Sequence, residues 1–254
     1  GNTWINSIGL SGGTERTQTY FSYANTRSSG IIPENKLSRH NITFRETGSF
    51  LNNKLTLDGS ANVIIQKVNN APVTGLYFNP LTGLYLFPRG MDLAPYKNNI
   101  EKFNEVRQIN LQNWPFNEDV QQNPYWIIHR NASITERTRT LFSASARYEF
   151  TDWLNIQARG NMDRTNDTYD ANIYAGTHGV LSGPNGRYIT SNLTTTQFYG
   201  DVILNFSKSF NDIKLNALVG SSITDTKTKG MRADSYNGNL YIANFFTIQN
   251  MTPG

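Results

Sequence analysis

The strongest constraint on the fold comes from one region, residues 142–163, in which apolar and polar residues alternate strictly in two successive runs. The stretch ASARYEFTDWLNIQARGNMDRT, from Ala144 to Thr165, covers most of it. Successive side chains of an extended strand point to opposite faces, so each run has one apolar and one polar face. Two such runs joined by the short turn TDW predict an antiparallel hairpin. The apolar positions are Phe142, Ala144, Ala146, Tyr148 and Phe150, then Leu154, Ile156, Ala158, Gly160 and Met162.

Each arm is about ten residues long, roughly twice the usual strand of a soluble domain and enough for a tilted strand to cross a bilayer. The 254 residues are 37% hydrophobic. A mean hydropathy of -0.50 excludes membrane helices. A transmembrane β-barrel is compatible with these values, because only alternate residues of its strands are apolar.

Residue types exclude several kinds of chemistry. The chain has no Cys, and its three His residues (His40, His129 and His178) lie far apart in the sequence. Neither a thiolate metal site nor a nucleophilic triad is therefore indicated. The net charge of +4 is too small to indicate a nucleic-acid partner. We expect no metal, no cofactor and no enzymatic activity.

The hairpin pattern occurs four times, which predicts an all-β, antiparallel fold of about eight long strands. Short turns alternate with longer connections, so all short turns lie on one rim and all long loops on the other, as in outer-membrane barrels. The expected strands are Trp4–Gly12, Thr17–Thr26, Ser38–Thr47, Lys54–Lys67, Thr138–Phe150, Leu154–Thr165, Thr196–Ser207 and Ile213–Thr224. We expect Val63, Ala158, Val202, Leu204 and Ala217 to face lipid.

The segment 68–137 is the longest connection, and we expect an external loop there. It holds six of the nine Pro residues, which argues against sheet, and 100–111 is expected to form a short helix. A second long loop is expected at 166–195. The aromatic residues of segment 68–137 either contact a ligand or partner or form the loop's own core. The candidate contacts are Tyr77, Phe78, Tyr85, Phe87, Trp114, Tyr125 and Trp126.

Charged residues on the polar faces of the strands are candidates for a barrel lumen, namely Arg147, Arg159 and Asp201. The alternative for the two arginines is that they pair with Glu149 and Asp163 across the hairpin, which we favour, because opposite charges on neighbouring strands stabilise a sheet.

The run from Ser11 to Val63 resembles SusC/RagA-type TonB-dependent transporters of Bacteroidetes. The resemblance depends on SGGTER, then GII, then Arg39, then the Leu55–Gly59 strand, and YEFTDWLNIQARGNMDRT extends it downstream. It implies a segment of a barrel of about 22 strands. It further implies active import of oligosaccharides or peptides across the outer membrane, a SusD-like surface lipoprotein, energy from TonB–ExbB–ExbD, and contact with lipid and lipopolysaccharide. The family's plug domain, TonB box, signal peptide and later strands are not recognised in residues 1–254.

Two other interpretations are a soluble carbohydrate-binding β-sandwich and an outer-membrane barrel enzyme. Neither explains the family resemblance, and a sandwich does not explain ten-residue arms. Eight strands of a wide barrel cannot close on themselves. We therefore expect an open, curved sheet in which Trp4–Gly12 and Ile213–Thr224 are the outer strands and do not pair with each other.

Overall fold

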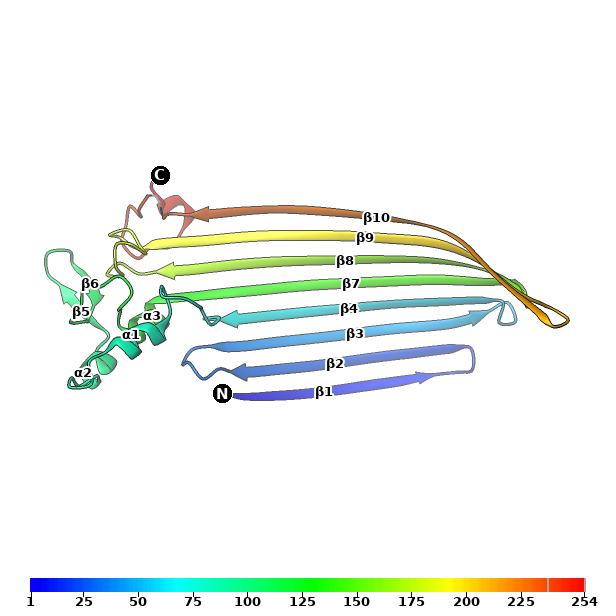
Figure 1. Cartoon of the computed structure of the whole chain (residues 1–254), viewed down its shortest axis with the longest axis horizontal. Coiled ribbons are helices and arrows are strands. Elements are labelled where there is room, and N and C mark those ends of the chain that lie inside the picture. Colours follow the sequence, from blue (N-terminus) through cyan, green and yellow to red (C-terminus); the bar gives the residue numbers. More distant parts are fainter. Residues whose placement is uncertain (237, 254) are drawn as a thin grey trace.

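The computed structural model describes residues 1–236 and 238–253. Its main body is one antiparallel sheet of eight strands, each paired with its neighbours along the chain (Figure 1). The only other sheet of the described residues has two strands, so the fold is not a β-sandwich. The eight strands are β1 (Asn2–Gly13), β2 (Thr17–Ser29), β3 (Lys36–Phe50), β4 (Leu55–Asn69), β7 (Asn131–Thr151), β8 (Leu154–Ile173), β9 (Arg187–Phe210) and β10 (Ile213–Asp234).

The sheet is open. Its order is β1-β2-β3-β4-β7-β8-β9-β10, and no pairing joins β1 to β10 within the described part of the chain. The prediction of an open sheet with these two outer strands is confirmed. Both outer strands are exposed over almost their whole length.

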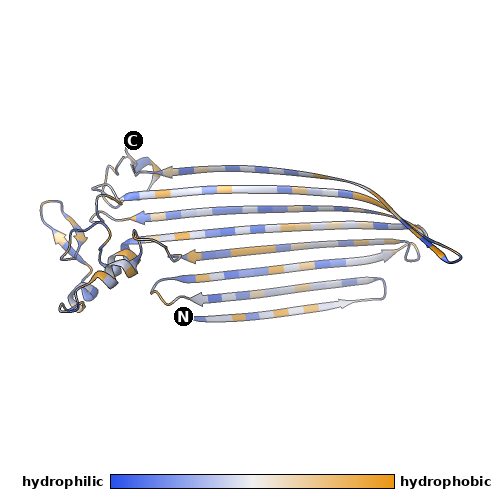
Figure 2. Ribbon diagram, viewed as in Figure 1, coloured by the Kyte–Doolittle hydropathy of each residue, from blue (hydrophilic) through white to orange (hydrophobic). Residues whose placement is uncertain are grey.

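The register confirms the two faces expected from the alternation. In the third hairpin Ala146 lies opposite Ala158, and Ala158 lies opposite Val202 on the next strand. Apolar positions of neighbouring strands therefore share one face, here called the apolar face, and the intervening residues form the polar face. Figure 2 shows this alternation along the strands.

The short turns gather at one end of the sheet and the long connections at the other (Figure 1). The turns suit their residues, because Asn adopts the left-handed conformation more readily than most residues. Asn52 has φ 56° in the β3–β4 turn, and Asn211 has φ 50° between β9 and β10. The rim asymmetry expected from the sequence is present.

The strands are longer than predicted, because the expected loops at 68–137 and 166–195 include residues that belong to β4, β7, β8 and β9. Ladder pairing continues there, for example between Arg137 and Asp167. Around this pair both faces are polar, so the apolar alternation stops although backbone pairing continues. The connections proper are 70–130 and 174–186.

The segment 70–130 forms a folded unit at the loop end of the sheet, here called the loop unit. Its elements are α1 (Pro80–Leu86), α2 (Ala94–Asn98), β5 (Glu101–Asn104), β6 (Ile109–Gln112) and α3 (Pro124–Arg130), and a 3-10 helix, Ile248–Asn250, follows β10. The helix expected at 100–111 is wrong, because β5 and β6 form a hairpin there. Its turn is fixed by Asn104, whose Oδ1 accepts a hydrogen bond from the Arg107 backbone N–H, and by Gln108 at φ 53°.

Asn-Pro pairs begin two of the helices. The side chain of Asn79 accepts a hydrogen bond from Leu81 N at the start of α1, and Asn123 accepts one from Tyr125 N at the start of α3. Such capping satisfies backbone donors that a helix leaves free at its N-terminus. In the part of the chain that the structure describes, no helix is both long and apolar enough to cross a membrane.

Candidate functional site

The polar face carries ion pairs between neighbouring strands. Arg159 on β8 lies opposite Asp201 on β9. Its Nε is 2.9 Å from Asp201 Oδ1, and its Nη2 is 2.7 Å from Oδ2. The Tyr199 hydroxyl donates a further hydrogen bond of 2.6 Å to Oδ2. The Asp201 carboxylate is thus saturated with donors, and its side chain is only 3% exposed.

Further pairs follow the same face. Arg139 is bound to Asp163, and Arg137 Nε is 2.6 Å from Asp167 Oδ1. The prediction that Arg159 forms an ion pair is therefore correct, but the predicted partner is wrong. Asp163 binds Arg139 and not Arg159. The other sequence candidate, Arg147, contacts Glu149 at 3.1 Å on its own strand, and not across the hairpin.

The β8–β9 register explains that error. These strands are joined by the long connection 174–186, so no tight turn reveals from the sequence which residues lie opposite each other. All three candidates for a lumen lie on the polar face, and each has an ion-pair partner.

The loop unit packs onto the polar face at the loop end of the sheet. Trp126 on α3 is fully buried, and its Nε1 donates a hydrogen bond of 2.9 Å to Thr177 Oγ1. Thr177 in turn bonds to Asn131 Oδ1 at the start of β7. Arg130 binds Glu101 through two hydrogen bonds, which raise the pKa of the guanidinium and hold α3 against β5. The loop unit is therefore ordered by its own contacts.

The aromatic candidates separate into two groups. Phe87 and Trp114 belong to a small core in which their ring centroids are 5.3 Å apart, and Tyr96 and Phe116 pack against them. With Trp126, these candidates hold the loop unit together and offer little surface to a ligand. Tyr85 is 82% exposed. Tyr77 is also exposed, and Tyr125 is half-buried beside the ammonium group of Lys97.

Phe78 behaves differently from the other candidates. Its ring packs against a buried cluster on the polar face formed by Ala171, Ile173 and Ile189. Its φ is 58°, a left-handed conformation that is unfavourable for a bulky residue. The loop unit therefore holds this ring against the sheet despite backbone strain.

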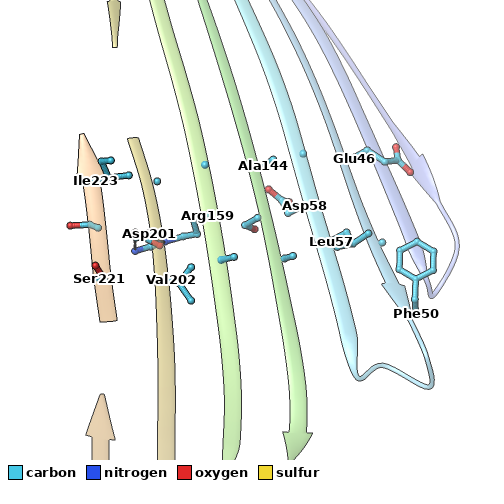
Figure 3. Close-up of a pocket in the computed structure, with 18 of the residues that line it drawn as sticks. Glu46, Phe50, Leu57, Asp58, Ala144, Arg159, Asp201, Val202, Ser221 and Ile223 are labelled. Atoms are coloured by element: carbon cyan, nitrogen blue, oxygen red, sulfur yellow. Dashed lines mark hydrogen bonds and ion pairs between the residues drawn. The ribbon is translucent and has the colours of Figure 1, made fainter. Parts of the chain in front are cut away.

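A shallow hollow of about 950 Å³ lies on the apolar face. Its floor consists of small residues on adjacent strands, among them Gly59, Ala144, Gly160 and Gly200. Figure 3 shows its surroundings, including Phe50, Leu57, Val202 and Ile223. Arg159 and Asp201 appear there too, but the register assigns their side chains to the polar face. Glu46 and Ser221 are polar residues of the hollow on this face, and the Glu46 carboxylate accepts a hydrogen bond from the Thr19 hydroxyl. The hollow lies on the other face from the loop unit's contacts.

The described residues contain no group of three His, Asp or Glu side chains placed to hold a metal ion. The carboxylates that the strands bring close together are instead held by arginines.

No known protein-family model matches the chain. No curated protein sequence matches it significantly either.

Solved structures do match it. A chain of the RagAB peptide transporter aligns over 99% of this chain with a TM-score of 0.73 and 14% identity. The RagAB peptide importer aligns in its open-open state with a TM-score of 0.68 and 14% identity, and in its closed-closed state with 0.67 and 15%. In each case the match spans 27% of the RagAB chain. At this identity the likeness shows the fold alone: the chain has the fold of an eight-stranded segment of a RagAB transporter barrel, as its sequence resemblance implied.

Proposed function

We propose that this chain forms part of the wall and external loops of a SusC-like outer-membrane importer. The observation that carries the proposal is the open eight-stranded sheet. A RagAB transporter chain aligns with 99% of the residues of the present chain. The apolar face would contact membrane lipid and lipopolysaccharide, and the polar face would line the lumen. The loop unit would then lie on the external rim, at the entrance.

The charge arrangement on the polar face supports a transport role. A lumen must be polar enough to be wetted and must not hold a passing cargo too tightly. Arginines paired with carboxylates, such as Arg159 with Asp201, meet both conditions because their charges are already compensated.

We propose peptides as the cargo, with oligosaccharides as the alternative. Peptide transport is the activity that the RagAB structures name. Energy would come from TonB–ExbB–ExbD through a plug domain and a TonB box, to which we assign none of the residues 1–254.

A SusD-like surface lipoprotein is the proposed partner, and the exposed side of α1 is the surface we propose for it or for the cargo. Leu84, Tyr85 and Leu86 of α1 are exposed, and Tyr77 is exposed three residues before the helix begins. Exposed apolar residues gathered in one segment are typical of binding surfaces.

Uptake in the native cell tests the proposal. The gene would be disrupted, and the cells supplied with fluorescent oligopeptides and with oligosaccharides of similar mass. We expect uptake of the oligopeptides to be lost and to return when the intact gene is restored. Unchanged uptake of both cargoes would contradict an import role, and loss of oligosaccharide uptake alone would establish the alternative cargo.

A further inference from the structure

A cavity of about 220 Å³ lies at the loop end of the polar face, between the sheet and the loop unit. It is partly open to solvent. The sheet contributes Tyr169, Ala171, Ile173 and Ile189, and the loop unit contributes Phe78 and Ile127.

Phe78, which lines this cavity, has a strained backbone. A glycine would adopt a φ of 58° without cost, whereas this chain places a phenylalanine there and directs its ring against Ala171, Ile173 and Ile189. Strain of this kind persists only where the surrounding structure holds the residue in place, and ligand-binding positions are among the places where it is found.

Among the polar side chains that line the cavity, Asn131 Nδ2 is buried without a hydrogen-bond partner in the described part of the chain, whereas Asn70 is fully bonded within the protein. Asn70 Nδ2 donates to the Ile128 carbonyl at 3.0 Å, and Asn70 Oδ1 accepts from Ser133 N at 2.9 Å. The Asn70 N–H donates to the Ser133 carbonyl at 2.8 Å. A sugar ring placed here would bury several hydroxyls, of which the single Asn131 amide could bond only one or two, and burial of the others is unfavourable. An aliphatic or aromatic side chain would bury only apolar surface.

We propose that this cavity is a subsite for one apolar side chain, the size of Leu, Ile, Met or Phe, of a cargo peptide. The inference rests on the proposed import function and makes it more specific. The cavity lies on the face that we assign to the lumen, at the rim where cargo enters. A peptide could therefore insert one side chain while its backbone stays in the wetted passage.

Peptide binding to the purified full-length protein in detergent tests the subsite. Two hexapeptides of Gly and Ser would be compared, one carrying a single central Leu and the other Ser at that position. Burial of the Leu side chain should make its peptide bind about tenfold more tightly or better. Isothermal titration calorimetry would measure both dissociation constants.

Filling the cavity should remove the preference. Ala171 is buried at the cavity wall, and Ala171→Phe would occupy the space intended for the cargo side chain. Ala132→Phe is the matched control, because Ala132 lies opposite Asn172, the next residue after Ala171, and therefore on the other face of the sheet. The control should keep the Leu preference. Phe78→Gly suits the φ at that position, removes one wall and should also weaken the preference, even if Ala171→Phe does not assemble.

The outcomes separate the two claims. Equal binding of the Leu and Ser peptides, or a Leu preference unchanged in both cavity variants, overturns the subsite and leaves peptide import standing. Binding of oligosaccharides with no binding of either peptide overturns peptide import and the subsite together.

Discussion

Arg159 lies directly opposite Asp201 across the β8–β9 ladder, with its Nη2 2.7 Å from the carboxylate Oδ2. The two strands are joined by 13 residues of non-strand chain, 174–186, so this pair is one of the contacts that fix their register on the polar face. The Tyr199 hydroxyl completes the arrangement from the same strand as Asp201.

Asp201→Ala should destabilise the sheet, because it leaves Arg159 and the Tyr199 hydroxyl without their shared acceptor. We expect the full-length protein in detergent to unfold at clearly lower urea concentration, measured by loss of its heat-modifiable gel mobility. Asp225→Ala is the control, since Asp225 pairs with Lys227 on an exposed part of β10 and both side chains are more than half exposed. Equal effects of the two substitutions would contradict the role given to Asp201.

Arginine on the apolar face should be costly where that face meets lipid. Leu204→Arg or Val202→Arg should lower the free energy of unfolding in a bilayer by about 2–4 kcal/mol near the midplane. Asn205→Arg is the matched control, because Asn205 lies on the polar face and its side chain donates to Asn155. It should have a mild effect. Equal losses at Leu204 and Asn205 in a lipid-refolding assay would contradict the assignment of the faces.

The sequence predicts the faces and the hairpins well because alternation and tight turns are local signals. Ala146 and Ala158 lie close to a two-residue turn, and a register shift between Glu149 and Thr151 places both on the apolar face, as the alternation in each arm predicts. The partner of Arg159 depends on a register across a long connection, which no local pattern reports. The strand ends are missed for a related reason: around Arg137 and Asp167 both faces are polar, and only backbone pairing continues.

The loop unit is harder to predict because its contacts are distant in sequence. Trp126 is buried by Thr177 and Asn131 from other elements, so the aromatic composition alone does not distinguish it from exposed Tyr85. The β5–β6 hairpin is missed because each of its strands has only four residues. In so short a run, the alternation of a strand cannot be distinguished from the periodicity of a helix.

Replacing residues 72–129 by a short Gly-Ser linker should preserve assembly and abolish uptake. The flanking strands meet without the loop unit, because Asn69 lies opposite Ile134 and the Asn70 N–H donates to the Ser133 carbonyl. Heat-modifiable mobility should therefore persist, while peptide uptake or lipoprotein docking is lost. Loss of mobility would show instead that the sheet depends on the loop unit for its assembly.

Tyr77 should titrate at unusually high pH. Its hydroxyl donates a hydrogen bond of 3.1 Å to Asp119 Oδ2, and this bond raises the pKa of Tyr77 above its usual value. The folded state holds the proton more tightly than the unfolded state. The resulting stabilisation is therefore complete below about pH 10 and is lost as the pH rises through the raised pKa.

The ultraviolet difference between the wild-type protein and Tyr77→Phe isolates this one tyrosinate. Its midpoint should lie above about pH 10, and Asp119→Asn should move it down. A midpoint that does not respond to Asp119→Asn would contradict the contact.

The outer strands should need partners. One edge of β1 and one edge of β10 have no paired strand in the described residues. Unpaired backbone N–H and carbonyl groups cost several kcal/mol each in hydrocarbon. Residues 1–254 refolded alone in detergent should therefore form multimers through these edges, whereas the full-length protein should run as a heat-modifiable monomer. A heat-modifiable monomer of residues 1–254 alone would mean that β1 pairs with β10 in a closed eight-stranded barrel. Such a barrel has room only for its own side chains, so that result would contradict the proposed import function.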